Sequence, residues 1–287
     1  MNIVAVSISQ LDDQTARDHD IHILDYPFFV NGEQYDVHIT DPPAHQDGIR
    51  AIVLNRNNRC TTSGVNEAQL LEIYEKLADA PFLSVHQGRA WSEVSYAAMN
   101  KIAQERPEIP CTIVNTHHTT AGYTVQLLQL ARTLADGRSW EDHAERYAID
   151  RRNTAHIGAI PDLFFLHRSG RIGLAKALLG TAMKAIPLLT IRDEVESAKP
   201  FGRVRSYAQA NLRMVRAIEQ DLERVGGDRV EIVVAWYGPH EAERDHLLSL
   251  IREKGWRGNL DVFTGKFSAA PHLGPDYWEV GYTVHAD

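Results

Sequence analysis

In the first half of the chain, short apolar runs alternate with longer segments whose apolar residues recur at helical spacing. Short runs of this kind predict strands, and the longer periodic segments predict helices. Strands that alternate with helices favour a parallel sheet covered by helices. We expect strands at residues 3–8, 21–30, 34–39, 82–85 and 111–114, and helices at 66–74, 92–99 and 120–135.

The second half has a different order of segments, with two long amphipathic helices and several apolar strand-like runs. A length of 287 residues suits two domains of roughly 150 residues each, although one large α/β domain would also fit. We predict an N-terminal α/β domain with a parallel sheet at 1–155 and a C-terminal α/β domain at 156–287. In the second half we expect helices at 139–151, 174–185, 205–224 and 239–254, and strands at 155–160, 186–191, 229–236, 260–267 and 278–284.

Local signals refine this assignment. Asn31-Gly32 between two strand-like runs predicts a tight hairpin. Asn66 and Ser92 are each placed to cap a helix. Residues 41–58 are rich in Pro, Asn, Asp and Arg and are expected to form a loop, as are residues 270–276.

Composition and charge exclude several classes of protein. The net charge of −8 argues against a nucleic-acid binder. No apolar stretch approaches the roughly 20 residues that span a bilayer, and the first residues do not resemble a signal peptide. Two cysteines, Cys60 and Cys111, in a chain of this length are typical of reduced, cytoplasmic proteins and not of a disulfide framework.

Hydroxyl side chains stand just before two of the predicted helices. Thr61-Thr62-Ser63 precedes the helix at 66–74, and Ser92 begins the next. Loops between strand and helix lie at the carboxyl ends of parallel strands, where ligands bind, and the helix N-terminus favours a carboxylate or phosphate. The simpler interpretation, which stays open, is that Ser92 only caps its helix.

Two other groups could contact an anion. His272, between Pro271 and Gly274, is expected on a rigid exposed turn, where it could donate a hydrogen bond or be an ordinary surface histidine. Arg203 and Arg205 are expected at the start of a long helix, where they could grip a phosphate or an acidic partner surface, or could simply be solvated.

Motifs for other chemistries are absent from the sequence. His117-His118 is a weak metal signal because adjacent side chains diverge, and there is no HExxH or CxxC. There is also no GxSxG elbow, Walker loop or GxGxxG. We therefore expect no metal and no nucleotide cofactor.

Taken together, several segments resemble the DegV-like lipid-binding family in the same order over nearly the whole chain. They are Thr62-Ser63, the loop with Ser92, Asn115-Thr116 with Gly122, Phe165-Leu166-His167-Arg168-Ser169-Gly170-Arg171-Ile172, Gly202-Arg203-Val204-Arg205 and His272-Leu273-Gly274-Pro275. The Gly-Arg-Ile and arginine segments together make the resemblance specific.

The resemblance implies two α/β domains with one long-chain fatty acid in a buried slot between them. It implies that Thr62, Ser63, Ser92 and His272 hold the carboxylate, and that the slot also involves Ser7, Glu93, Thr116, Gly122 and Arg171. It further implies that the chain has no catalytic residues and presents the carboxylate to a separate fatty acid kinase, with Arg203 and Arg205 contacting that partner.

Two other functions stay open at this point. Ser92 and His272 could serve a small-molecule transferase or hydrolase, but that reaction needs a third, orienting group that the sequence does not reveal. Glu93 follows Ser92, and if it pointed inward it would repel an anionic ligand. The chain would then be an interaction protein that does not bind lipid.

Overall fold

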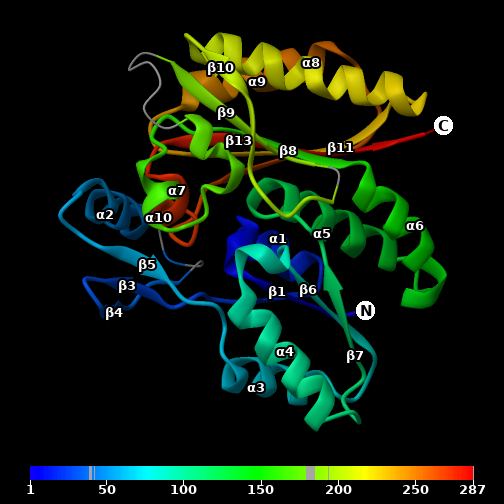
Figure 1. Cartoon of the computed structure of the whole chain (residues 1–287). Helices are drawn as coiled ribbons and strands as arrows, with labels where there is room; N and C mark the ends of the chain where they lie inside the picture. Colours follow the sequence, from blue (N-terminus) through cyan, green and yellow to red (C-terminus); the bar gives the residue numbers. More distant parts are fainter. Residues whose placement is uncertain (39–40, 42, 179–184, 193, 287) are drawn as a thin grey trace.

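The computed structural model describes residues 1–38, 41, 43–178, 185–192 and 194–286. In this part of the chain the strands form three sheets (Figure 1). The first is a four-stranded parallel sheet, which confirms the prediction for the first half. In order across the sheet, its strands are β2 (Ile21–Leu24), β1 (Ile3–Val6), β6 (Phe82–His86) and β7 (Cys111–Asn115).

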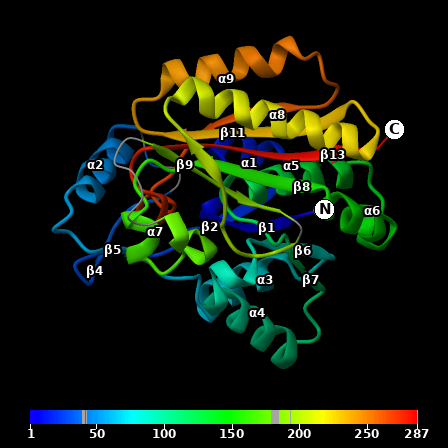
Figure 2. The same ribbon diagram turned by 45° about the horizontal axis from the view of Figure 1, so that its top comes forward.

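The second sheet has six strands and is mainly antiparallel, with a single parallel pair, β11 and β12. In order across the sheet, its strands are β10 (Lys199–Val204), β9 (Ile186–Ile191), β8 (Thr154–Ala159), β13 (Tyr277–His285), β11 (Arg229–Tyr237) and β12 (Leu260–Thr264). Helices α8 (Tyr207–Val225) and α9 (Glu241–Glu253) lie side by side on its outer face (Figure 2).

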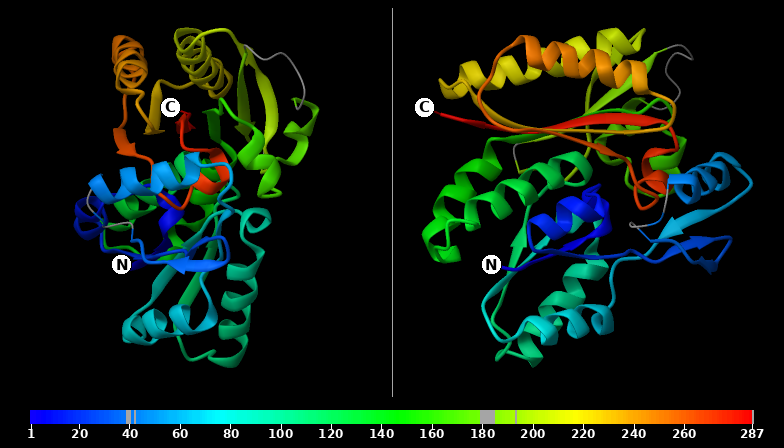
Figure 3. Two further views of the ribbon diagram at one scale, coloured as in Figure 1. Left: turned by 90° about the vertical axis from the view of Figure 1, so that its left-hand side faces the viewer. Right: turned by 180° about the vertical axis from the view of Figure 1, so that it is seen from behind.

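Helix α5 (Thr120–Leu134) lies between the two sheets, and α6 (Trp140–Arg152) follows it. Helices α3 (Glu67–Leu77) and α4 (Glu93–Glu105) are on the far side of the parallel sheet. A third, antiparallel sheet of β4 (Glu33–Tyr35), β3 (Phe28–Val30) and β5 (Cys60–Thr62) extends to one side with α2 (Pro43–Leu54) (Figure 3). Short helical elements complete the described chain: η1 (Ser7–Ser9), α1 (Asp13–Asp18), η2 (Arg89–Trp91), α7 (Phe164–Arg168), η3 (Gly173–Leu178) and α10 (Ala270–Leu273).

Several local predictions are confirmed. Asn31 and Gly32 both have positive φ, 54° and 93°, between β3 and β4, as a tight hairpin turn requires. Asn66 caps α3 by accepting a hydrogen bond from the Gln69 N–H (3.0 Å), and the Gln69 side chain accepts one from the Asn66 N–H (3.1 Å).

Other local predictions are wrong. Residues 43–54 form a helix and not a loop, because Ile49 and Val53 are spaced to bury one face and Pro43 is tolerated at a helix start. Residues 270–273 form the short helix α10. Residues 21–30 contain two strands, and residues 199–204, for which no helix or strand is predicted, form the edge strand β10. In the helix predicted at 174–185, the described part is a 3-10 helix over Gly173–Leu178, and 179–184 lie outside the described residues.

Helix α5 joins the two halves of the structure through its buried N-terminal half. The Tyr123 hydroxyl accepts a hydrogen bond from the Val6 N–H (3.2 Å) and donates one to the Val85 carbonyl (2.7 Å), so one side chain bonds to two strands of the parallel sheet. On its opposite side, α5 packs on β13 so closely that a Cβ at Gly281 would overlap the Ala121 carbonyl. Gly122 is similarly confined, since its Cβ would lie 2.8 Å from His118 Nδ1.

We predict opposite stability changes for two glycine-to-alanine substitutions. Gly281→Ala should lower the free energy of unfolding by at least about 3 kcal/mol, because overlap with the α5 backbone cannot be relieved by rotating a side chain. Gly48→Ala, in the middle of α2 with nothing within 4 Å of its Cβ position, should raise it by about 0.5–1 kcal/mol. Urea denaturation of both variants tests this, and equal effects would contradict the packing of α5 on β13.

Candidate functional site

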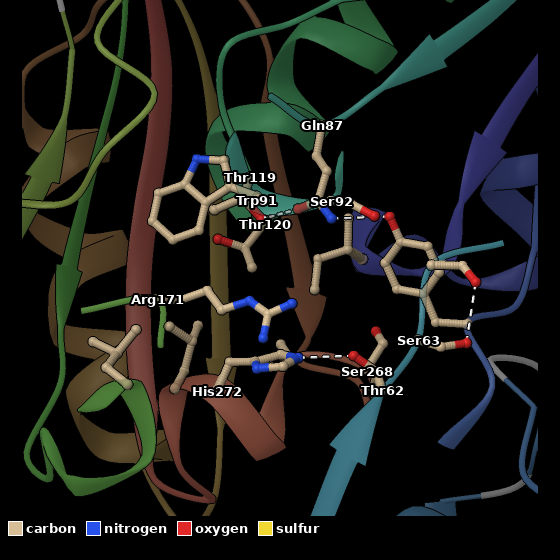
Figure 4. Close-up of a pocket in the computed structure, with 16 residues that line it drawn as sticks. Thr62, Ser63, Gln87, Trp91, Ser92, Thr119, Thr120, Arg171, Ser268 and His272 are labelled. Atoms are coloured by element: carbon tan, nitrogen blue, oxygen red, sulfur yellow. Dashed lines mark hydrogen bonds between the residues drawn. The ribbon is translucent and has the colours of Figure 1, made fainter. Parts of the chain in front are cut away.

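A cavity lies where the three sheets meet, beside the N-terminus of α5 (Figure 4). It has about 500 Å³ of atom-free space, including space open to solvent. Its walls come from the ends of β5 and β6 and from the segments around η2, α7 and α10. The residues that line it are Ile8, Tyr26, Thr62, Ser63, Gly64, Gln87, Trp91, Ser92, Thr119, Thr120, Leu166, Arg171, Ser268, Ala269, His272 and Leu273.

Hydroxyl groups surround this cavity. Thr62, at the end of β5, bonds through Oγ1 to His272 Nε2 (2.8 Å). Ser92 occupies the predicted N-cap position of α4, but its Oγ bonds to Ser95 Oγ (2.9 Å) and makes no capping bond to the helix backbone. Ser63 is exposed at the rim of the cavity. A Cβ at Gly64 would lie 2.9 Å from Ser92 Oγ, so the backbone there passes directly beside that hydroxyl.

Arg171 provides a positive charge in the middle of these groups. Its side chain extends into the cavity toward Thr62 and His272 (Figure 4). Its Nη1 donates a hydrogen bond to the Ser169 carbonyl (2.6 Å), and the guanidinium forms no ion pair with any carboxylate of the described residues. Burial lowers the pKa of this guanidinium, as expected for a cation removed from water without a counter-charge.

His272 is a neutral group at this site. Burial, together with the nearby positive charges of Arg171 and Arg168, lowers the pKa of its imidazole to about 3. Its Nδ1 is buried and has no hydrogen-bond partner among the described residues. The prediction of an exposed turn around His272 is therefore wrong: α10 holds the imidazole inside the protein, against the cavity.

A series of hydrogen-bonded polar side chains forms the opposite wall of the cavity. The Gln87 side chain donates from Nε2 to the Tyr26 hydroxyl (2.9 Å) and accepts from Thr119 Oγ1 (2.6 Å). Thr120 has a φ of 43°, which is rare for a β-branched residue, and its Oγ1 donates to Glu279 (2.9 Å). Strained backbone of this kind is often found at binding sites.

The structure brings together five of the residues predicted for the site: Thr62, Ser63, Ser92, Arg171 and His272 all line the cavity. The others lie elsewhere. Ser7 supports the wall from behind, because its carbonyl accepts from Ser268 Oγ (2.9 Å) and its Oγ from the Tyr26 N–H (3.0 Å). Thr116 donates to the His86 carbonyl (3.0 Å), and Gly122 packs beneath His118.

The remaining three predicted residues are exposed. Glu93 has a side chain that is 78% exposed and pairs with Arg89 (3.4 Å), so it does not point into the cavity. Arg203 lies on β10 and Arg205 just before α8, both exposed. The predicted position of Arg203 at the helix start is therefore wrong.

Sequence reasoning missed Tyr26, Gln87, Trp91, Thr119, Thr120 and Ser268. A signal existed for Thr119-Thr120, which follow a predicted strand and precede a helix in the same way as Thr62-Ser63. Nothing in the sequence marks the others as cavity residues.

A second cavity, here called the apolar arm, adjoins the first and shares Trp91, Thr119, Leu166 and Leu273 with it. It has about 330 Å³ of atom-free space, including space open to solvent. Its other lining residues are His156, Gly158, Ile160, Leu189, Thr190, Ile191 and Ala198. The combined space has a polar, cationic end and a mostly apolar end, an arrangement that suits an amphipathic anion.

The described residues contain no cluster of three or more His, Cys, Asp or Glu side chains that could hold a metal ion. In the same part of the chain, every helix is too short or too polar to cross a bilayer.

Comparison with known proteins shows which family the sequence matches. The sequence model of the DegV family, whose members are described as uncharacterised proteins, matches residues 1–284. A DegV domain-containing protein of Streptomyces coelicolor is 27% identical over 187 residues, 64% of each chain. One from Streptococcus pneumoniae is 22% identical over 282 residues, 96% of each chain.

Solved structures share the fold. A fatty acid-binding DegV family protein from Thermus thermophilus has a TM-score of 0.86, at 22% identity and 99% coverage of both chains. A stearic acid-binding protein from Eubacterium ventriosum has a TM-score of 0.85, at 15% identity and coverage of 99% of this chain and 98% of that one. These likenesses confirm the predicted α/β fold.

We predict that the free energy of unfolding decreases as the pH falls from about 6.5 toward 3. Burial lowers the pKa values of His86, His118 and His272 to about 3 in the folded chain, from 6.5. Between these values the unfolded chain binds protons that the native chain does not, so acid favours unfolding. Urea denaturation across this pH range measures how steeply the free energy of unfolding changes with pH. His272→Gln should make this dependence shallower, and an unchanged dependence would show that His272 is not buried in its neutral form.

Proposed function

The chain belongs to the DegV family, and we propose that it is a carrier that binds one long-chain fatty acid, with the carboxylate beside Arg171 and the acyl chain in the apolar arm. The observation that carries this proposal is the Arg171 guanidinium, which is half-buried, faces the cavity and has no carboxylate partner among the described residues. A cation held out of water in this way is stabilised by an anion that enters the cavity.

The groups around Arg171 favour a carboxylate. Thr62 and Ser92 can each donate a hydroxyl hydrogen, and a carboxylate accepts several such bonds at once. Ser63 Oγ donates to the Gly64 carbonyl (3.1 Å) and would have to turn away from it to reach the ligand. With His272 Nε2 as the donor to Thr62 Oγ1, the Thr62 hydrogen is free to point at the ligand. Each methylene buried in the apolar arm adds about 0.8 kcal/mol, so most of the affinity for a fatty acid would come from its chain.

The site is poorly suited to hydrolysis or group transfer. His272 bonds to Thr62 and not to Ser92, and no described group orients its Nδ1. A histidine with a pKa of about 3 is also a weak general base at neutral pH. We therefore favour a binding role over the transferase or hydrolase. Glu93, exposed and paired with Arg89, leaves the cavity free for an anion, which favours lipid binding over a role as an interaction protein alone.

We further propose that the carrier works in the cytoplasm and presents the bound carboxylate to a partner kinase. Both cysteines are free, which suits a reducing compartment. Arg203 and Arg205 are exposed on neighbouring parts of the six-stranded half, where they could contact an acidic or phosphate-bearing partner.

We also propose the division of the chain into domains at 1–155 and 156–287, with the cavity between them.

Arg171→Met should weaken fatty acid binding by at least about 30-fold, because the buried carboxylate would lose its counter-charge. Arg171→Lys keeps the charge without the planar fork and should lose less affinity. Titration of stearic acid against the fluorescence of Trp91, which lines the cavity, measures both changes. Equal affinity in the Met variant and the wild type would show that Arg171 does not hold the ligand.

The double variant Arg203→Gln/Arg205→Gln should bind stearic acid normally but lower the rate at which a fatty acid kinase of the same organism phosphorylates the bound acid. Both side chains are exposed, and neither lines the cavity. The matched control is Arg216→Gln, which replaces an exposed arginine on α8. It should leave the rate of phosphorylation unchanged. An unchanged rate in the double variant would remove these arginines from the partner contact.

A further inference from the structure

Two side chains that line the apolar arm have a buried hydrogen-bonding atom without a partner among the described residues, the donor Nε1 of Trp91 and Nδ1 of His156. Three of its lining residues are polar: Thr119, Thr190 and His156. Thr119 Oγ1 donates to Gln87 (2.6 Å), and Thr190 Oγ1 donates to the His156 carbonyl (2.9 Å) and accepts from Arg192 Nε (3.3 Å). His156 differs from both, because its Nδ1 has no partner among the described residues.

His156 is almost completely enclosed. Only 8% of its side chain is accessible, and the residue lines the arm. An unsatisfied polar atom in such a place costs about 1–3 kcal/mol, and native proteins rarely leave one without a partner such as a ligand or an ordered water.

Glu279 determines which hydrogen-bonding role this atom has. The Glu279 side chain is fully buried and accepts from Thr120 Oγ1 (2.9 Å) and the Ala121 N–H (3.1 Å). The same carboxylate lies 2.8 Å from His156 Nε2. Since a carboxylate accepts hydrogen bonds, Nε2 carries the hydrogen, and in the neutral ring Nδ1 is left as an acceptor. The free atom therefore needs a donor, and the hydrocarbon chain of a plain fatty acid offers none.

We propose that His156 selects a fatty acid whose chain carries a hydroxyl group, with that hydroxyl donating to His156 Nδ1. This inference rests on the proposed function, because it assumes that the carboxylate lies at Arg171 and that the chain enters the arm. A hydroxyl satisfies the histidine in either protonation state, because it both donates and accepts. The apolar neighbours Ile160, Leu189 and Leu273 contact the rest of the chain.

The test compares stearic acid with monohydroxystearic acids that differ only in the position of the hydroxyl, each titrated against the wild-type protein. At least one isomer should bind about tenfold more tightly than stearic acid, which corresponds to one satisfied buried hydrogen bond. If stearic acid binds and every hydroxystearic acid binds equally or more weakly, a buried water or no group at all occupies the site, and the inference is wrong. If none of the acids binds, the proposed function itself fails, and this inference fails with it.

Variants test whether His156 causes the preference for a hydroxy acid. His156→Phe keeps a planar aromatic ring without a nitrogen and should abolish the preference for the hydroxy acid while keeping stearic acid binding. Because Glu279 would lose a partner, His156→Phe/Glu279→Gln provides a second test in case the single variant unfolds. Thr190→Val, in the same arm, removes a hydroxyl that already has partners and should preserve the preference. A preference that persists without His156 would overturn the assignment.

Discussion

The burial of the first turn of α5 between the two sheets is the constraint on which the site depends. A helix N-terminus has N–H groups without partners inside the helix, and burying them requires an acceptor. Glu279, from the central strand β13, supplies it by accepting from the Ala121 N–H and from Thr120 Oγ1. The absence of a side chain at Gly281 lets the helix come close enough for this contact. Thr119 and Thr120 are thereby held at the wall of the cavity.

The cavity keeps a positive charge because its side chains come from segments that are far apart in the sequence. Arg171 comes from the segment after α7, Thr62 from β5 and His272 from α10, and none of these segments brings a carboxylate to the guanidinium. The nearby acidic residue Glu279 is already occupied by three donors. The cavity therefore keeps a positive charge and a neutral histidine, a combination that favours an anion and disfavours acid–base catalysis. The apolar arm, which shares Trp91 and Leu273 with the first cavity, favours an anion that carries a hydrocarbon chain.

The sequence predicts many of the helices, strands and cavity residues, but it does not predict the contacts between distant segments that enclose the cavity. Asn31-Gly32 and the cap at Asn66 are local signals, and local contacts decide them. Residues 43–54 were misassigned because their polar composition hides Ile49 and Val53, which become buried only when the rest of the chain folds over them. Motif resemblance identified Thr62, Ser92, Arg171 and His272. It could not show that Glu93 turns outward or that Arg171 has no carboxylate partner among the described residues. Those facts depend on contacts between residues far apart in sequence.

The central claim is that the cavity holds one fatty acid. Native mass spectrometry of the purified wild-type chain, followed by extraction and identification of any bound lipid under denaturing conditions, tests it most directly. The account predicts a mass increase equal to one fatty acid per chain, which disappears on denaturation and is absent from the Arg171→Met variant. A folded protein that carries no lipid, and that gains no thermal stability when fatty acids are added in excess, would contradict it.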